Sequence, residues 1–159
     1  IKKYTLKMNE INKSLAFNTN YFKEYYNNYR NKYEHLFSSE KYFFNQVLDN
    51  SKNILDVGSA SGGMYKIITD LSSNITYEGV DISLELIAEA KKRYPEGTFS
   101  LIDGKTLPYN DNQFDSVISF GTTVHETSWK NLISECFRVS NKKVLIQKWC
   151  KALFSGLWP

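Results

Sequence analysis

Three acidic residues stand at the ends of short apolar runs, and the first of them comes just before a turn of small residues. These residues are Asp56, Asp81 and Asp103, and the turn at residues 58–63 reads GSASGG. A turn with so few side chains lets a ligand approach the backbone, and a helix that follows it offers free N–H groups to an anion. An acidic residue one strand further along commonly accepts hydrogen bonds from the hydroxyls of a ribose. The spacing therefore predicts a site for an adenosine ligand with an anionic tail.

NAD is the alternative ligand for such a turn. Compared with the pattern G-x-G-x-x-G, the turn matches at Gly58 and Gly63 but has Ala60 in the middle, which is a weak match. The carboxylate of Asp56, two residues before Gly58, would repel a pyrophosphate and attract an ammonium or sulfonium group. Asp56 therefore favours S-adenosylmethionine, and disfavours an NAD-dependent oxidoreductase. A second role for Asp56, compatible with the first, is to accept hydrogen bonds from backbone N–H groups of the adjoining loop.

The elements that must position these residues alternate along the second part of the chain. Expected strands cover residues 53–57, 75–80, 98–102, 114–120 and 143–149, and expected helices cover residues 63–71, 84–93 and 129–139. This alternation predicts an α/β, Rossmann-like fold with a mainly parallel sheet flanked by helices. Ligands of such sheets bind beyond the carboxyl ends of the strands, which is where the three aspartates fall.

Residues 1–50 differ in composition and are predicted to form an N-terminal helical extension, followed by the cofactor-binding domain at residues 51–159. Tyr21, Tyr25, Tyr29 and Tyr33 are spaced four apart, which places them on one face of a helix. We expect this aromatic face to pack on the core. The alternative is that one of these tyrosines covers a ligand pocket.

Several blocks, in the right order, resemble the class I S-adenosylmethionine-dependent methyltransferases over residues 54–149. ILDVGSASGG resembles the family motif D/E-x-G-x-G-x-G, with Asp56, Gly58 and Gly62 matching and Ala60 where glycine is usual. YEGVDIS is similar to the second-strand block and LIDG to the third. The resemblance implies S-adenosylmethionine as the cofactor.

The resemblance also implies roles for individual residues. Asp81 would hold the ribose, Ile82 would flank the adenine, and Asp103 would meet the adenine amino group with Gly104 at the ring face. The remaining residues of the expected cofactor site belong to the glycine turn or end the fourth strand: Asp56, Gly58, Ser59, Ala60, Gly62 and Phe120.

The stretch FGTTVHE, residues 120–126, follows the fourth strand and would face the transferred methyl group. His125 is its imidazole and the candidate base or hydrogen-bond partner of the acceptor, although a structural role is an equal alternative. The stretch lacks the Asn/Asp-Pro-Pro-aromatic and Pro-Cys signatures of enzymes that methylate DNA bases. We therefore expect a small-molecule acceptor. The alternative is a non-catalytic module that serves a protein partner.

Composition narrows the class further. The net charge of +3 is mild, and the lysines are scattered rather than clustered as in nucleic-acid binders. The apolar runs are too short to span a membrane, and Cys136 and Cys150 lack the spacing of metal ligands. These features predict a cytoplasmic protein without a metal. SNKK, residues 140–143, replaces the proline-glycine turn that usually precedes the fifth strand, and the two family strands after the fifth are expected to be missing.

Overall fold

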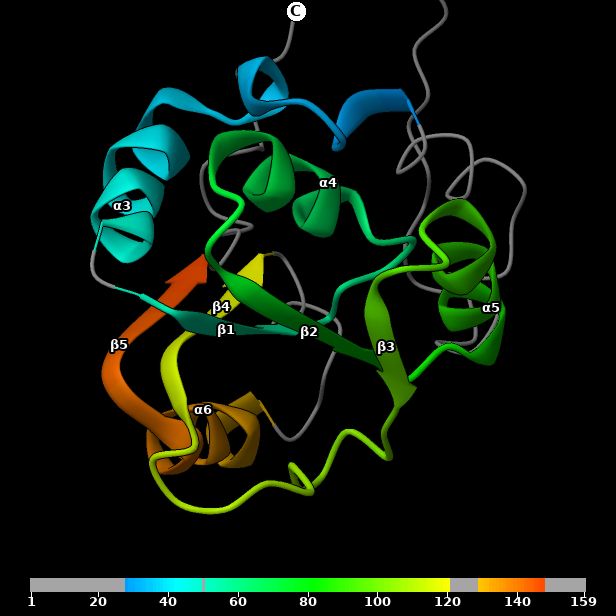
Figure 1. The fold of residues 1–159 in the computed structure, drawn as a ribbon. Helices are drawn as coiled ribbons and strands as arrows, with labels where there is room; N and C mark the ends of the chain where they lie inside the picture. Colours follow the sequence, from blue (N-terminus) through cyan, green and yellow to red (C-terminus); the bar gives the residue numbers. More distant parts are fainter. Residues whose placement is uncertain (1–27, 50, 121–128, 148–159) are drawn as a thin grey trace, which may run out of the picture.

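The computed structural model describes residues 28–49, 51–120 and 129–147 (Figure 1). Its five strands form one parallel sheet in the order β3-β2-β1-β4-β5. The strands are β1 (Asn53–Val57), β2 (Thr76–Asp81), β3 (Thr98–Leu101), β4 (Phe114–Phe120) and β5 (Ser140–Gln147). The predicted α/β, Rossmann-like fold is confirmed. The strand order reverses between β1 and β4, and this is the point at which such sheets bind their ligands.

Helices cover both faces of the sheet (Figure 1). They are α3 (Ser38–Leu48), α4 (Gly63–Leu71), α5 (Leu84–Arg93) and α6 (Trp129–Val139), with a short 3-10 helix η1 (Tyr33–His35) before them. Helices α3, α4 and α5 lie on one face and α6 lies on the other. The bounds of α4, α5 and α6 are those predicted from the sequence. Ser83 caps α5 as expected, because its hydroxyl accepts a hydrogen bond from the backbone N–H of Leu86.

The central strand β1 carries apolar side chains on both of its faces, because helices cover both faces of the sheet. Ile54 is buried under the three-helix face, whereas Leu55 and Val57 are buried on the face of α6. This is the pattern expected for a parallel strand between two layers of helices, where side chains alternate between the faces. Asp56 follows the same alternation and points, with Ile54, toward the three-helix face.

The fifth strand begins earlier than predicted. It starts at Ser140, directly after α6, so that SNKK is part of the strand rather than a turn before it. Its pairing with β4 shifts between Phe114 and Ser116, whose partners are Ser140 and Lys143. One extra residue on β5 therefore forms a bulge, which accommodates turn-forming residues within a paired strand. Trp149, the predicted end, lies outside the described residues.

The aromatic stripe does not form one continuous helical face. Residues 28–29 are helical, the chain bends at residues 30–32, and Tyr33 begins the separate helix η1. Tyr29 is 60% exposed, so it does not pack on the core. The expected packing on the core is therefore wrong for Tyr29. Tyr33 does pack against the core, but from η1 and not from one helix shared with Tyr29. Tyr21 and Tyr25 lie outside the described residues. The bend instead directs Arg30 toward the sheet.

Candidate functional site

The glycine turn leaves β1 and is fastened to β2. The backbone N–H groups of Gly58 and Ser59 both donate to the carbonyl oxygen of Val80, at 2.8 and 3.0 Å. Three turn residues adopt left-handed backbone angles, with φ of 85° at Gly58, 48° at Ala60 and 83° at Gly62. Such angles favour glycine because a Cβ atom is strained there. The glycines are thus required by the path of the turn, and Ala60 is the one strained position.

Asp81 ends β2 beside this turn and is 8% exposed. Its Oδ2 accepts a hydrogen bond from the Ala60 N–H, and its Oδ1 accepts one from the Ser83 N–H, both at 2.9 Å. Burial raises the pKa of Asp81 above its ordinary value, and the backbone donors oppose that shift. A carboxylate has about four acceptor positions, so these backbone donors do not use all of them. The hydroxyls of a ribose are suitable donors for the remaining positions.

Asp56 is 1% exposed and accepts a hydrogen bond of 2.7 Å from the hydroxyl of Tyr77. Burial, above all, raises the pKa of Asp56 to about 7; the Tyr77 hydroxyl opposes this shift, nearby Asp81 adds to it, and Arg30 also opposes it. The backbone hydrogen bonds considered as a second role for Asp56 are not found among the described residues. In their place, the Tyr77 side chain holds the carboxyl group.

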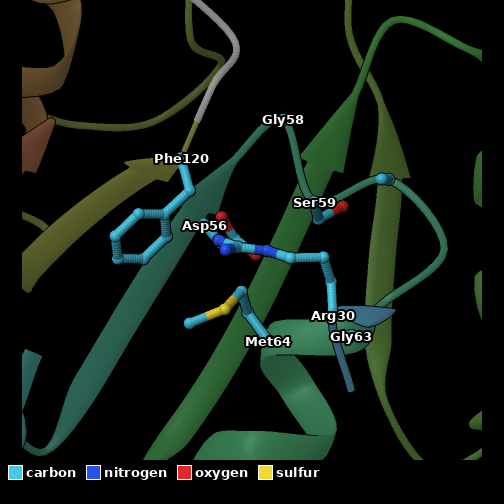
Figure 2. A pocket seen from close by; sticks show the side chains of 8 residues that line it. Arg30, Asp56, Gly58, Ser59, Gly63, Met64 and Phe120 are labelled. Atoms are coloured by element: carbon cyan, nitrogen blue, oxygen red, sulfur yellow. The ribbon is translucent and has the colours of Figure 1, made fainter. Parts of the chain in front are cut away.

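A small cavity lies at the carboxyl ends of β1 and β4, where the strand order reverses (Figure 2). It has a volume of about 30 Å³, which suits a group of a few atoms such as a carboxylate rather than a nucleoside. Its lining includes Asp56, four turn residues and two side chains from other elements, Met64 and Phe120, together with Arg30. Of the residues expected to bind the cofactor, the lining includes Asp56, Gly58, Ser59, Ala60 and Phe120, but not Gly62.

Three other predicted residues lie along the rim of β2 and β3 instead. Ile82 is 52% exposed, and its role beside the adenine remains a prediction. Asp103 is exposed, and its Oδ1 accepts hydrogen bonds from the backbone N–H groups of Lys105 and Thr106, which lower its pKa. Gly104 follows with a left-handed φ of 74°. Asp103 makes no hydrogen bond to the turn, Asp56 or Asp81 within the described residues.

Arg30 and Tyr77 belong to the site but were not predicted from the sequence. Tyr77, Gly79 and Asp81 alternate along β2, so their side chains lie on the same face of the strand. This spacing could have placed Tyr77 on the side of the sheet that Asp81 faces. Arg30 belongs to no motif and is distant in sequence, so no local pattern indicates its place. His125 lies outside the described residues. Its catalytic role remains a prediction.

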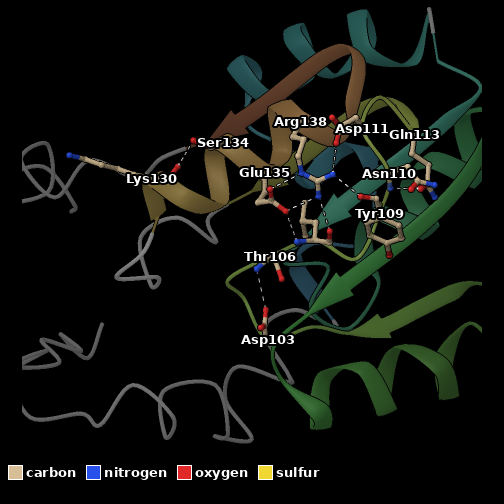
Figure 3. A network of polar contacts seen from close by, with 11 residues as sticks. Asp103, Thr106, Tyr109, Asn110, Asp111, Gln113, Lys130, Ser134, Glu135 and Arg138 are labelled. Atoms are coloured by element: carbon tan, nitrogen blue, oxygen red, sulfur yellow. Dashed lines mark hydrogen bonds and ion pairs between the residues drawn. The ribbon is translucent and has the colours of Figure 1, made fainter.

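The loop that carries Asp103 and Gly104 is fastened to α6 by a polar network (Figure 3). The guanidinium of Arg138 donates to both carboxylate oxygens of Glu135, at 2.7 and 2.8 Å, and to the carbonyl oxygens of Leu107 and Tyr109. Glu135 in turn accepts from the Leu107 N–H at 2.8 Å. The hydrogen bond from Arg138 is the main cause that lowers the pKa of Glu135 to about 2. The network thus fixes the path of the loop that runs from β3 to β4.

Replacing Arg138 by glutamine should destabilise this loop. The Arg138→Gln variant loses the paired hydrogen bonds to Glu135, and we expect its free energy of unfolding to fall by about 2 kcal/mol, the scale for hydrogen bonds to charged groups. Urea denaturation measures this loss, and hydrogen exchange should show faster exchange at residues 103–113. Lys142→Gln, which removes a more exposed cation, is the control and should change stability by less than about 1 kcal/mol. Equal stability of the two variants would contradict the role given to Arg138.

The sequence model of a family described as "Methyltransferase domain" matches residues 55–146, which is more than half of the chain. The chain belongs to the methyltransferase domain family. This match begins one residue before Asp56 and ends within β5. It therefore includes the turn, Asp81 and Asp103 but leaves out Arg30.

Individual relatives of this methyltransferase domain agree with the family. A demethylmenaquinone methyltransferase of Thermotoga maritima is 26% identical over 95 residues, covering 59% of this chain and 41% of that protein. The ubiquinone/menaquinone biosynthesis C-methyltransferase UbiE of Rickettsia bellii is 34% identical over 90 residues, covering 50% and 36%. The crystal structure of an S-adenosylmethionine-dependent methyltransferase from Aquifex aeolicus has the same fold, with a TM-score of 0.60, 19% identity and coverage of 72% and 65%. The chain spans less than half the length of the two curated relatives.

Family membership implies S-adenosylmethionine as the cofactor, and the residues present fit this molecule. The hydroxyl of Ser59 is buried at the cavity and finds no hydrogen-bond partner among the described residues, so it is available to a ligand. Asp81 retains acceptor positions for a ribose, and Asp56 suits a cationic group. Within the described residues no group of histidine, cysteine or acidic side chains is arranged to hold a metal ion. The same part of the chain has no helix with the length and apolar character needed to cross a membrane.

Ala60 offers a direct test of the strain in the turn of this methyltransferase domain. Glycine removes a left-handed strain of about 1 to 2 kcal/mol, but the added entropy of the unfolded chain costs about 0.4 to 1 kcal/mol. We expect Ala60→Gly to raise the free energy of unfolding by between zero and about 1 kcal/mol, measured in urea. Asn112, with a φ of 56°, provides the comparison because asparagine tolerates this conformation, so that Asn112→Gly should gain less. A clear loss of stability in Ala60→Gly would show that the methyl group is needed.

Proposed function

We propose that this chain is the cofactor-binding part of an S-adenosylmethionine-dependent methyltransferase that acts on a small-molecule acceptor. One observation carries the proposal. Two buried carboxyl groups, Asp56 and Asp81, flank one glycine turn at the switch point of a parallel sheet, and Asp81 is bonded to the turn through the Ala60 N–H. The first suits the cationic part of the cofactor and the second its ribose.

The roles proposed for the remaining residues follow from their positions. Ile82, Asp103 and Gly104 would bind the adenine along the rim, whereas Ser59 and the start of α4 would bind the opposite end of the cofactor. When bound, S-adenosylmethionine supplies a methyl group already activated by its sulfonium charge. The chain then has to orient this end and exclude water from it. Phe120 and Met64, which line the cavity with apolar surface, are suited to that task.

The acceptor is proposed to be a small molecule, and His125 is the proposed base for an acceptor that must lose a proton. One curated relative is named as a demethylmenaquinone methyltransferase and another as a ubiquinone/menaquinone biosynthesis C-methyltransferase, which makes a demethylated quinone head group the first acceptor to test.

Transfer of a labelled methyl group tests this function. The protein, in a form extended to the length of its relatives, is incubated with labelled S-adenosylmethionine and a panel of phenols, quinols, amines and carboxylates. We expect label in at least one acceptor, and less label with Asp81→Asn when the cofactor is kept below saturation. His125→Asn should lower transfer while leaving the binding of S-adenosylhomocysteine unchanged. Binding of the cofactor without transfer to any acceptor would favour the non-catalytic alternative.

A further inference from the structure

We infer that Arg93, the last residue of α5, is a positioning residue: it holds the second half of the glycine turn, Ser61 and Gly62, and thereby sets the affinity for the cofactor. This inference rests on the proposed function and adds to it a residue that does not touch the cofactor itself. The described residues that line the cavity include neither Arg93 nor Ser61, so the contact acts on the turn from outside the cavity.

The second half of the turn needs support from another element. The first half is fastened to β2 through the backbone N–H groups of Gly58 and Ser59, which donate to a β2 carbonyl oxygen. Within the described residues, Ser61 and Gly62 make no hydrogen bond to the sheet, and the Gly62 N–H donates to the carbonyl oxygen of Ser59 in the same turn, at 3.0 Å. The position of this half therefore depends on what packs against it.

The Arg93 side chain supplies one of these contacts. Its Nη1 donates a hydrogen bond of 3.1 Å to the Oγ of Ser61, which is fully buried and 32 positions earlier in the sequence. The guanidinium also lies over the ring of Tyr94, with 5.1 Å between its carbon and the ring centroid, an arrangement that restricts its motion. A hydrogen bond from a charged donor is about twice as strong as one between neutral groups. Arg93 thus fixes the Ser61 side chain.

The ring of Tyr94 provides a second contact with the turn. A Cβ atom at Gly62 would lie 2.9 Å from a ring carbon of Tyr94 and 2.9 Å from a ring carbon of Phe99. Both rings therefore lie directly against the backbone of the turn. Tyr94 also packs against Tyr65 near the start of α4, with 5.4 Å between the ring centroids. The chain at the end of α5 therefore contacts the turn and the helix that follows it.

A displaced turn would misplace the groups that face the cofactor. Ser61 directly follows Ala60, whose N–H donates to Asp81, and it comes two residues before Gly63, where α4 begins. A shift of Ser61 therefore moves both the turn beside the proposed ribose carboxylate and the N-terminus of α4. Binding groups must be held within about 0.5 Å of their productive positions, so a small displacement is enough to weaken binding.

A double-mutant cycle tests this role. Calorimetry measures the affinity for S-adenosylhomocysteine in the wild-type protein, Ser61→Ala, Arg93→Gln and the variant with both changes. Each single change should weaken binding about 3- to 10-fold. The double variant should bind no more weakly than Arg93→Gln alone, because Arg93→Gln already removes the hydrogen bond that Ser61→Ala removes. Lys92→Gln, which removes the same charge at an exposed position of α5, should change the affinity by less than about twofold.

A purely structural role for Arg93 would lower stability without changing the affinity of the folded protein. The titrations are therefore made where urea denaturation shows each variant to be folded, and Ser61→Ala, which removes one oxygen atom, keeps the test valid if Arg93→Gln fails to fold. Unchanged affinity in Ser61→Ala, or two losses that multiply in the double variant, would overturn the inference while the proposed function stands. Failure of the wild-type protein to bind S-adenosylhomocysteine would instead overturn the proposed function, and the inference with it.

Discussion

Replacing Gly63 by alanine is expected to release the segment around Arg30 from the start of α4. A Cβ atom at Gly63 would lie 1.9 Å from the carbonyl oxygen of Arg30 and 2.9 Å from its carbonyl carbon. Both atoms belong to the backbone, so no side-chain rotation relieves the overlap. We expect the free energy of unfolding to fall by about 3 kcal/mol, the upper range for overpacking. Urea denaturation measures the loss, and limited proteolysis should show faster cleavage within residues 28–36.

The control for this prediction is Lys66→Ala in the same helix. The Lys66 side chain is 45% exposed and pairs with Asp70 at the surface, so its removal should cost less than about 1 kcal/mol. Because alanine favours helices more than glycine does, Gly63→Ala would stabilise α4 if the segment were not packed against it. A Gly63→Ala protein as stable as the wild type, with residues 28–36 still protected, would show that this packing is absent.

The second large effect is a dependence of stability on pH that comes from Asp56. Burial raises the pKa of Asp56 from 3.8 to about 7. The folded protein therefore keeps this proton more tightly than the unfolded chain does. The resulting stabilisation is complete below about pH 4 and is lost as the pH rises to about 7, and it amounts to about 4 kcal/mol at most.

Asp56→Asn isolates this contribution. Asparagine can still accept the hydrogen bond from Tyr77 but does not titrate, so the variant should gain stability relative to the wild type as the pH rises from 4 to 7. Other carboxyl groups, such as Glu135 with its lowered pKa, also make stability depend on pH. They do so equally in both proteins, so their contributions cancel when the free energies of unfolding are subtracted. Urea denaturation at several pH values gives that difference. A constant difference from pH 4 to 8 would mean that folding does not raise the pKa of Asp56.

Much of this fold could be predicted because its signals are local. The ends of β1 and β4 and those of α4, α5 and α6 agree with the sequence pattern, since apolar runs and capping residues act over a few positions. The three aspartates could be placed at strand ends for the same reason. The first residue of β5 could not, because Ser140 is paired through a bulge that depends on contacts with β4.

The contacts that complete the candidate site are not local. The Tyr77 hydroxyl reaches Asp56 because β1 and β2 pair with Ile54 opposite Tyr77, a register that the sequence does not specify. Arg30 reaches the cavity because the chain bends after residue 29 and because Glu40, ten residues later, holds its guanidinium. A tyrosine stripe at helical spacing suggested a different arrangement. The four-residue spacing of the tyrosines indicates only a local preference for a helix. The bend at residues 30–32 and the buried ion pair of Arg30 with Glu40 outweigh that preference.

The most direct test of the central claim is a calorimetric titration with S-adenosylhomocysteine and, separately, with NAD. The wild-type protein should bind S-adenosylhomocysteine and show no heat with NAD. Asp81→Asn should weaken S-adenosylhomocysteine by roughly 1 to 3 kcal/mol, whereas Asp70→Asn, the same change at an exposed position of α4, should not. Binding of NAD without a response to S-adenosylhomocysteine, or an unchanged affinity in Asp81→Asn, would contradict the account.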